Sequence, residues 1–91
     1  MKLDNLIHKK KDIISRVVDN QMLLLSPESR LLFRLNELGT HIWNQLDRYH
    51  LISELIKSIN STYQIEQDIL TNDLMDFLEE LKDKNLITID G

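Results

Sequence analysis

The stretch that decides the fold is residues 21–46, which read QMLLLSPESRLLFRLNELGTHIWNQL. It begins with two apolar runs, residues 21–25 and 30–35, on either side of the turn-forming sequence SPES at 26–29. This arrangement is typical of a β-hairpin. From Asn36, a good N-cap, the apolar residues recur at helical spacing instead. The chain is therefore expected to change from strand to helix at that residue.

Alternation within the second run assigns its side chains to two faces of the sheet. Leu31, Phe33 and Leu35 are expected on the core face, and Leu32 is expected on the open face between two arginines. Before this hairpin, the β-branched residues within 13–18 predict another strand, since such side chains suit a pleated surface.

After the hairpin, apolar stripes predict three helices and a short apolar ending. The predicted helices begin at Asn36, at about Ile52 and at about Gln67; residues 86–89 are expected to form a terminal strand or an extended tail. Strands followed by helices predict an α+β domain, with helices covering one face of a three-stranded antiparallel sheet.

Composition limits the class of protein to a small folded domain. The chain has 91 residues, 42% of them hydrophobic, no cysteine and a net charge of −4. It has no apolar run of membrane-spanning length and no secretory signal pattern, so a soluble cytoplasmic protein is expected. Residues 1–12 are expected to be a flexible lead-in to a domain at 13–91, with Lys9, Lys10 and Lys11 either solvated or contacting an acidic partner.

No catalytic or metal-binding pattern is present in the sequence. The three histidines, His8, His41 and His50, lack the spacing of a metal site, and two glycines cannot build a phosphate-binding loop. We therefore expect no enzyme activity, no metal and no cofactor.

Three carboxylates, Asp73, Asp76 and Glu80, lie together along one flank of the third predicted helix. They are interpreted either as a solvated boundary or as one wall of a groove for a peptide. The opposite flank carries Thr71, Met75 and Lys82, and the sequence leaves the choice of flank open.

An ordered set of short motifs resembles the PqqD family. The motifs are LLLSPE at 23–28, LNELG at 35–39, IWNQLD at 42–47, YQI at 63–65, DL followed by FL and L within 73–81, and NLI at 85–87. The likeness extends over about residues 14–89, and Arg48 departs from it where members often carry glycine.

This resemblance implies a winged-helix-like fold and the role of a RiPP recognition element, a chaperone for ribosomally made, later modified peptides. In that family the leader of the precursor docks between the third strand and the third helix. Mapped onto this sequence, the peptide-binding residues are Arg30, Leu31, Leu32, Phe33, Arg34, Leu35, Ile69, Asp73, Asp76, Phe77 and Glu80. A modifying enzyme, such as a radical SAM enzyme or a cyclase, or a leader peptidase then acts on the held precursor. The pathway is expected to make pyrroloquinoline quinone, a lasso peptide or another peptide product.

Two other functions remain as alternatives. A winged-helix nucleic-acid binder needs a basic recognition helix, whereas the third predicted helix is rich in aspartate and glutamate. A self-associating module, such as a homodimer, would use a free sheet edge to pair with a second copy.

Overall fold

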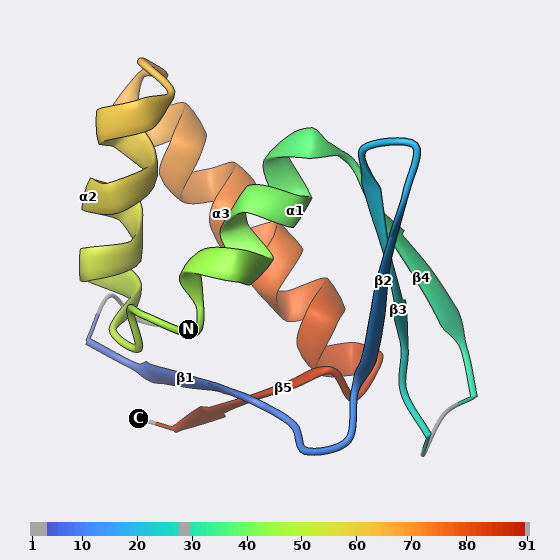
Figure 1. The fold of residues 1–91 in the computed structure, drawn as a ribbon. Coiled ribbons are helices and arrows are strands. Elements are labelled where there is room, and N and C mark those ends of the chain that lie inside the picture. The colour runs from blue at the N-terminus through green and yellow to red at the C-terminus, as the bar shows by residue number, and fades with distance from the viewer. Residues whose placement is uncertain (1–3, 28–29, 91) are drawn as a thin grey trace.

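The computed structural model describes residues 4–27 and 30–90. The elements in chain order are β1 (Leu6–Lys9), β2 (Ile14–Val18), β3 (Gln21–Leu25), β4 (Leu32–Leu35), α1 (Glu37–Gln45), α2 (Ile52–Thr62), α3 (Gln67–Asp83) and β5 (Ile87–Asp90). The helices lie on one side of the β2-β3-β4 sheet, and β1 and β5 run alongside each other at the base of the molecule (Figure 1). The α+β class is confirmed, with a three-stranded antiparallel sheet followed by three helices.

The sheet is a meander in the order β2-β3-β4. Asp19 and Asn20 connect β2 to β3 with φ angles of 52° and 64°. Two central residues with positive φ form the kind of turn whose twist matches that of the flanking strands. Asp19 and Asn20 therefore close a tight hairpin between β2 and β3.

The register divides the sheet into an inner and an outer face. Cross-strand partners share a face, so Met22 and Leu35 lie on the inner face and Leu23 and Arg34 lie on the outer one. The inner residues Met22, Leu24 and Leu35 are 7%, 0% and 1% exposed, because the helices cover them. The outer face receives no such cover.

The core lies between the inner face of the sheet and the three helices. Each helix buries one apolar stripe, as its spacing predicts. The buried helical residues are Ile42 and Trp43 of α1, Ile52, Leu55, Ile56 and Ile59 of α2, and Leu70, Leu74, Leu78 and Leu81 of α3. No helix within residues 4–27 and 30–90 is long and apolar enough to cross a bilayer.

Residues 6–9 correct the prediction of a flexible lead-in, while residues 1–3 lie outside the described part of the chain. β1 pairs antiparallel with β5, with Leu6 opposite Asp90. On its other side, the Ile7 N–H donates to the His50 carbonyl oxygen at 2.7 Å. Ile7 is fully buried, so β1 is part of the core. The prediction failed because both partners of β1 are distant in sequence and leave no local pattern.

Lys9 also departs from the interpretation of the N-terminal lysines as solvated. Its side chain is only 21% exposed, and its Nζ lies 2.9 Å from Asp47 Oδ1. The same Nζ lies 4.3 Å from the centroid of the Trp43 ring, within the range of a cation–π interaction. Lys9 therefore links β1 to Trp43 of α1 and to Asp47, which follows α1.

Leu31 is a second correction. The loop after β3 returns through Arg30, whose φ is 58°, and β4 begins only at Leu32. Leu31 is therefore outside the strand and 54% exposed, instead of lying on the core face as alternation predicts.

Candidate peptide-binding groove

β4 forms one border of the three-stranded sheet. Among the described strands it pairs with β3 alone, so its other edge offers backbone N–H and C=O groups to a further strand. β2 forms the opposite border. The two edges differ in their surroundings, because a groove adjoins the end of β4.

This groove has a volume of about 340 Å³ and lies between β4 and α3. It is lined by Gln21 of β3, by Phe33, Arg34 and Leu35 of β4, by Asn36, and by Phe77 and Glu80 of α3. Its apolar part comes from Phe33, Leu35 and Phe77, whereas Arg34 and Glu80 bring opposite charges. A groove of this composition can hold an apolar side chain and orient a polar one.

The junction between β4 and α1 places Phe77 in the groove. Asn36 caps α1, because its side-chain oxygen accepts a hydrogen bond of 2.8 Å from the Gly39 N–H. A Cβ atom on Gly39 would lie 3.4 Å from both Leu35 Cβ and Phe77 Cε1. Its distance to Asn36 Oδ1 would be a tighter 3.2 Å, so the absence of a side chain at Gly39 mainly leaves room for the cap oxygen, with Leu35 and Phe77 at contact distance.

A smaller cavity of about 120 Å³ adjoins the groove between α1 and α3. It is lined by Asn36, Leu38, Gly39, Ile42, Leu70, Asp73, Leu74 and Phe77. Asn36 and Phe77 line both spaces, so the ring of Phe77 stands between them. The second cavity is mainly apolar and suits a hydrophobic side chain.

Some of the predicted site residues line the groove or the adjoining cavity, and others line neither. Those that line the groove are Phe33, Arg34, Leu35, Phe77 and Glu80, while Asp73 lines the adjoining cavity. Three others are exposed and line neither space: Arg30 and Leu31, which precede β4, and Leu32, its first residue. Ile69 and Asp76 are exposed on α3 and line neither space.

The opposite flank of α3 has other surroundings. Thr71 lines a separate cavity against α2, and Met75 is half-buried against the core. The groove beside β4 thus adjoins the flank that carries Phe77 and Glu80.

Sequence reasoning missed Gln21, Asn36 and Gly39 as parts of the site. Gln21 has no local signal, since only the strand register brings it beside the end of β4. Asn36 and Gly39 belong to the LNELG motif, which was interpreted as a helix start and as part of the family resemblance, without a role in peptide binding. Their second role follows from the close approach of Phe77.

The histidines pack against other parts of the fold. The rings of His8 and His50 stack at 5.4 Å, and that of His41 lies edge-on to Tyr63 at 5.2 Å. His41 Nε2 is buried without a hydrogen-bond partner among the described residues. Within that part of the chain, no three His, Cys, Asp or Glu side chains are placed to hold a metal ion.

Comparisons with known proteins agree with this geometry. The model of the family described as "Coenzyme PQQ synthesis protein D (PqqD)" matches residues 21–87, from β3 into β5. A solved structure described as "TbiB1 in Complex with the TbiA(beta) Leader Peptide" is similar, with 26% identity and a TM-score of 0.78. That likeness covers 87% of this chain and 92% of the other. No curated protein matches significantly. Because the family model covers well over half of the sequence, the chain belongs to the PqqD family.

Proposed function

We propose that this protein is a non-catalytic RiPP recognition element that binds the leader of a ribosomally made precursor peptide. The leader adds as a strand to the free edge of β4 and is then presented to a modifying enzyme or a leader peptidase. The observation that carries the proposal is the groove of about 340 Å³ beside an unpaired strand edge. Family membership and the likeness to TbiB1, whose structure holds a leader peptide, support it.

The backbone of β4 supplies affinity that depends little on the leader sequence. An extended peptide beside β4 gains hydrogen bonds to the outward N–H and C=O groups, which are otherwise left to water. Alternate side chains of the guest then point to opposite faces of the sheet. One set enters the groove towards Phe77, and the other lies over the outer face near Leu32.

The groove supplies selectivity. Phe77 and the adjoining cavity accept an apolar side chain, whose burial is worth about 1.5–3 kcal/mol. Arg34 and Glu80 favour an acidic group near the strand and a basic group near the helix. A leader with the reverse order of charges is expected to bind more weakly.

Electrostatics favour a peptide over a nucleic acid as the ligand. The exposed side chains of α3 include Asp68, Asp73, Asp76, Glu79, Glu80 and Asp83. This surface repels phosphate groups, whereas nucleic-acid binders gain their affinity by neutralising them. The partners proposed are therefore a precursor leader and the enzyme that acts on it, a radical SAM enzyme, a cyclase or a peptidase. The product is pyrroloquinoline quinone, a lasso peptide or another modified peptide.

The test is a titration of the full chain against the fluorescein-labelled leader of the precursor encoded beside it, read by anisotropy. Phe77→Ala is expected to weaken binding about tenfold, or about 1.4 kcal/mol, because it removes the apolar wall of the groove. Met75→Ala is the matched control. It truncates another half-buried residue of α3 that packs on the core but lies outside the groove.

Strand addition is checked by hydrogen exchange. Amides of β4 are expected to gain protection when the leader binds, and those of β2, the other sheet border, are not. Equal leader affinity of Phe77→Ala and wild type, or protection of β2 instead of β4, would contradict the proposal.

A further inference from the structure

The outer face of the three-stranded sheet is an apolar surface that the fold leaves uncovered. The register places Ile14, Leu25 and Leu32 in one row across this face, and Arg16, Leu23 and Arg34 in the next. Ile14 is 55% exposed and Leu32 is 64% exposed, and Val18 of the same face is 45% exposed. Exposed apolar side chains gathered on one uncovered face are a feature of protein interaction sites.

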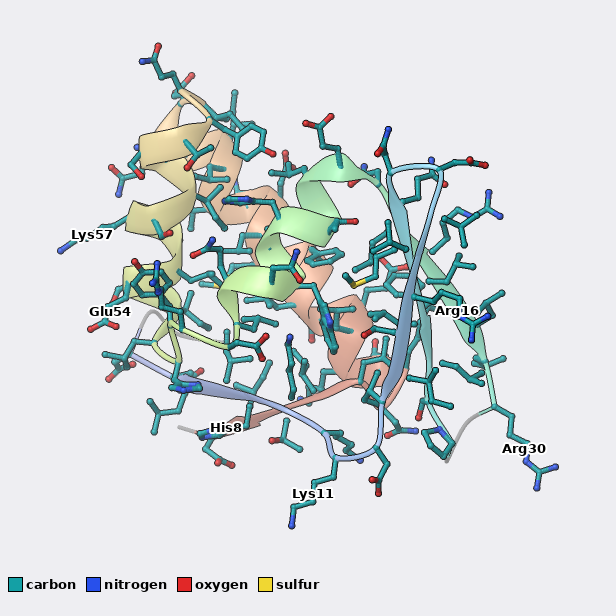
Figure 2. The ribbon with its side chains drawn as sticks, viewed as in Figure 1. His8, Lys11, Arg16, Arg30, Glu54 and Lys57 are labelled. Atoms are coloured by element: carbon teal, nitrogen blue, oxygen red, sulfur yellow. The ribbon has the colours of Figure 1, made fainter. Side chains whose placement is uncertain are left out.

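No described helix or strand packs on this side. The three helices all lie on the other side of the sheet (Figure 1). The side chains of Arg16 and Arg30 project away from the helices (Figure 2). Among the described residues, neither Arg16 nor Arg34 forms an ion pair. The charge of Arg16 is therefore available to a second partner, whereas that of Arg34 borders the leader groove.

The charge of this face is opposite to that of the whole chain. The protein carries a net charge of −4, and α3 exposes a row of carboxylates. The strand positions of the outer face instead carry two arginines and no acid. With Arg30 beside them, three of the four arginines in the sequence lie on this side.

This charge distribution selects the kind of partner. A second copy docked through the same face would bring arginines towards arginines, and like charges in a close interface are destabilising. A protein surface that combines apolar side chains with carboxylates fits both features, since complementary charge gives specificity and speeds association. Arginine is also the cation best suited to pair with carboxylates at an interface.

We propose that the outer face of the β2-β3-β4 sheet docks a partner protein whose contact surface pairs apolar side chains with carboxylates. The partner is the enzyme that acts on the held precursor, an identification that rests on the proposed function. β4 then contacts two partners at once. Its free edge pairs with the leader, and its outer face contacts the enzyme. The outward side chains of a bound leader would lie at the border of the docked enzyme.

The test measures binding of the purified enzyme encoded beside the precursor gene to the immobilised full chain, by biolayer interferometry. Two outer-face variants of β2, Ile14→Ser and Arg16→Glu, are expected to weaken this binding about tenfold or more. The matched controls are Val17→Ser and Ser15→Glu. They lie on the same exposed strand but on its other face, and are expected to change enzyme binding less than about twofold.

A parallel leader titration separates the two proposals. All four variants are expected to bind the labelled leader as wild type does, because β2 is remote from the edge of β4. Failure of the wild-type chain to bind its leader would contradict the proposed function. Intact leader binding with outer-face variants that bind the enzyme as wild type does would overturn the docking surface alone, whereas intact leader binding with no enzyme binding at all would overturn both the docking surface and the presentation step of the proposed function.

Two further outcomes also overturn the docking surface. One is a wild-type homodimer, seen by light scattering, that Ile14→Ser dissociates, since the face would then belong to a second copy. The other is binding of the wild-type chain, but not Arg16→Glu, to phosphatidylglycerol vesicles, since the apolar face and arginines would then serve a membrane. Absence of both, with the loss of enzyme binding described above, supports the proposal.

Discussion

Truncation of Ile7 to alanine tests whether β1 is part of the folded domain. Ile7 is 0% exposed, and the loss of a fully buried isoleucine side chain typically costs about 2–5 kcal/mol. A domain of this length has a total stability of roughly 5–14 kcal/mol, so the variant loses a large share of it. At about 4–8 °C for each kcal/mol, the melting temperature is expected to fall by at least about 8 °C.

The measurement is urea denaturation followed by circular dichroism, with Leu6→Ala as the control. Leu6 lies on the same strand but is 40% exposed, so its truncation is expected to cost only about 1 kcal/mol. Similar losses for the two variants, or a loss below about 1 kcal/mol for Ile7→Ala, would show that residues 6–9 contribute little to the core.

Three further changes test other contacts. Lys9→Met keeps the apolar stem but removes the charge near Asp47 and Trp43; it is expected to lower the free energy of unfolding by about 1 kcal/mol, less at high salt, in urea titrations. Asn85 has a φ of 60°, so Asn85→Val is expected to cost about 1–2 kcal/mol in the same assay, whereas Asn85→Gly is nearly neutral. Gly39→Ala gains up to about 1 kcal/mol in helix propensity, but its Cβ would lie only 3.2 Å from Oδ1 of Asn36, which lines both the groove and the adjoining cavity; anisotropy is therefore expected to show weaker leader binding, with little net change in stability. Unchanged leader affinity would refute the role assigned to this glycine.

Local patterns predicted the elements whose determinants are close in sequence. The apolar stripe of α3 recurs every three or four residues, so the spacing alone predicted this helix, in which Leu74, Leu78 and Leu81 are buried. Asn36 caps α1 through its side chain, as predicted, and Asn85 follows the last helix with a positive φ. These features depend on short-range backbone chemistry that residue type reveals directly.

Features set by distant partners were not predictable in the same way. β1 is stabilised by residues 50–52 and 87–90, which a local pattern cannot reveal. The positive φ of Arg30 delays the start of β4 and turns Leu31 outward, although the alternation of side chains suggested otherwise.

The candidate site likewise contains residues that local patterns predicted and residues that they did not predict. Helical spacing placed Phe77 and Glu80 on one flank of α3, and family resemblance assigned that flank to the peptide. Gln21 joins the groove through the pairing of β3 with β4, and Gly39 matters because Phe77 approaches it from another helix. Both contacts form only when the strands and helices pack together, so local sequence patterns do not reveal them.

The pairing of β1 with β5 has a consequence for synthesis of the chain. Residues 87–90 leave the ribosome about 80 residues after β1, and at 5–20 residues per second this delay is roughly 4–16 s. During this interval the hairpin and helices can form, and one edge of β1 can pair with residues 50–52. The other edge of β1, which later pairs with β5, still has unpaired backbone N–H and C=O groups. Lys9 ends this strand and two more lysines follow it, and positive charge at that position discourages two nascent chains from pairing through β1.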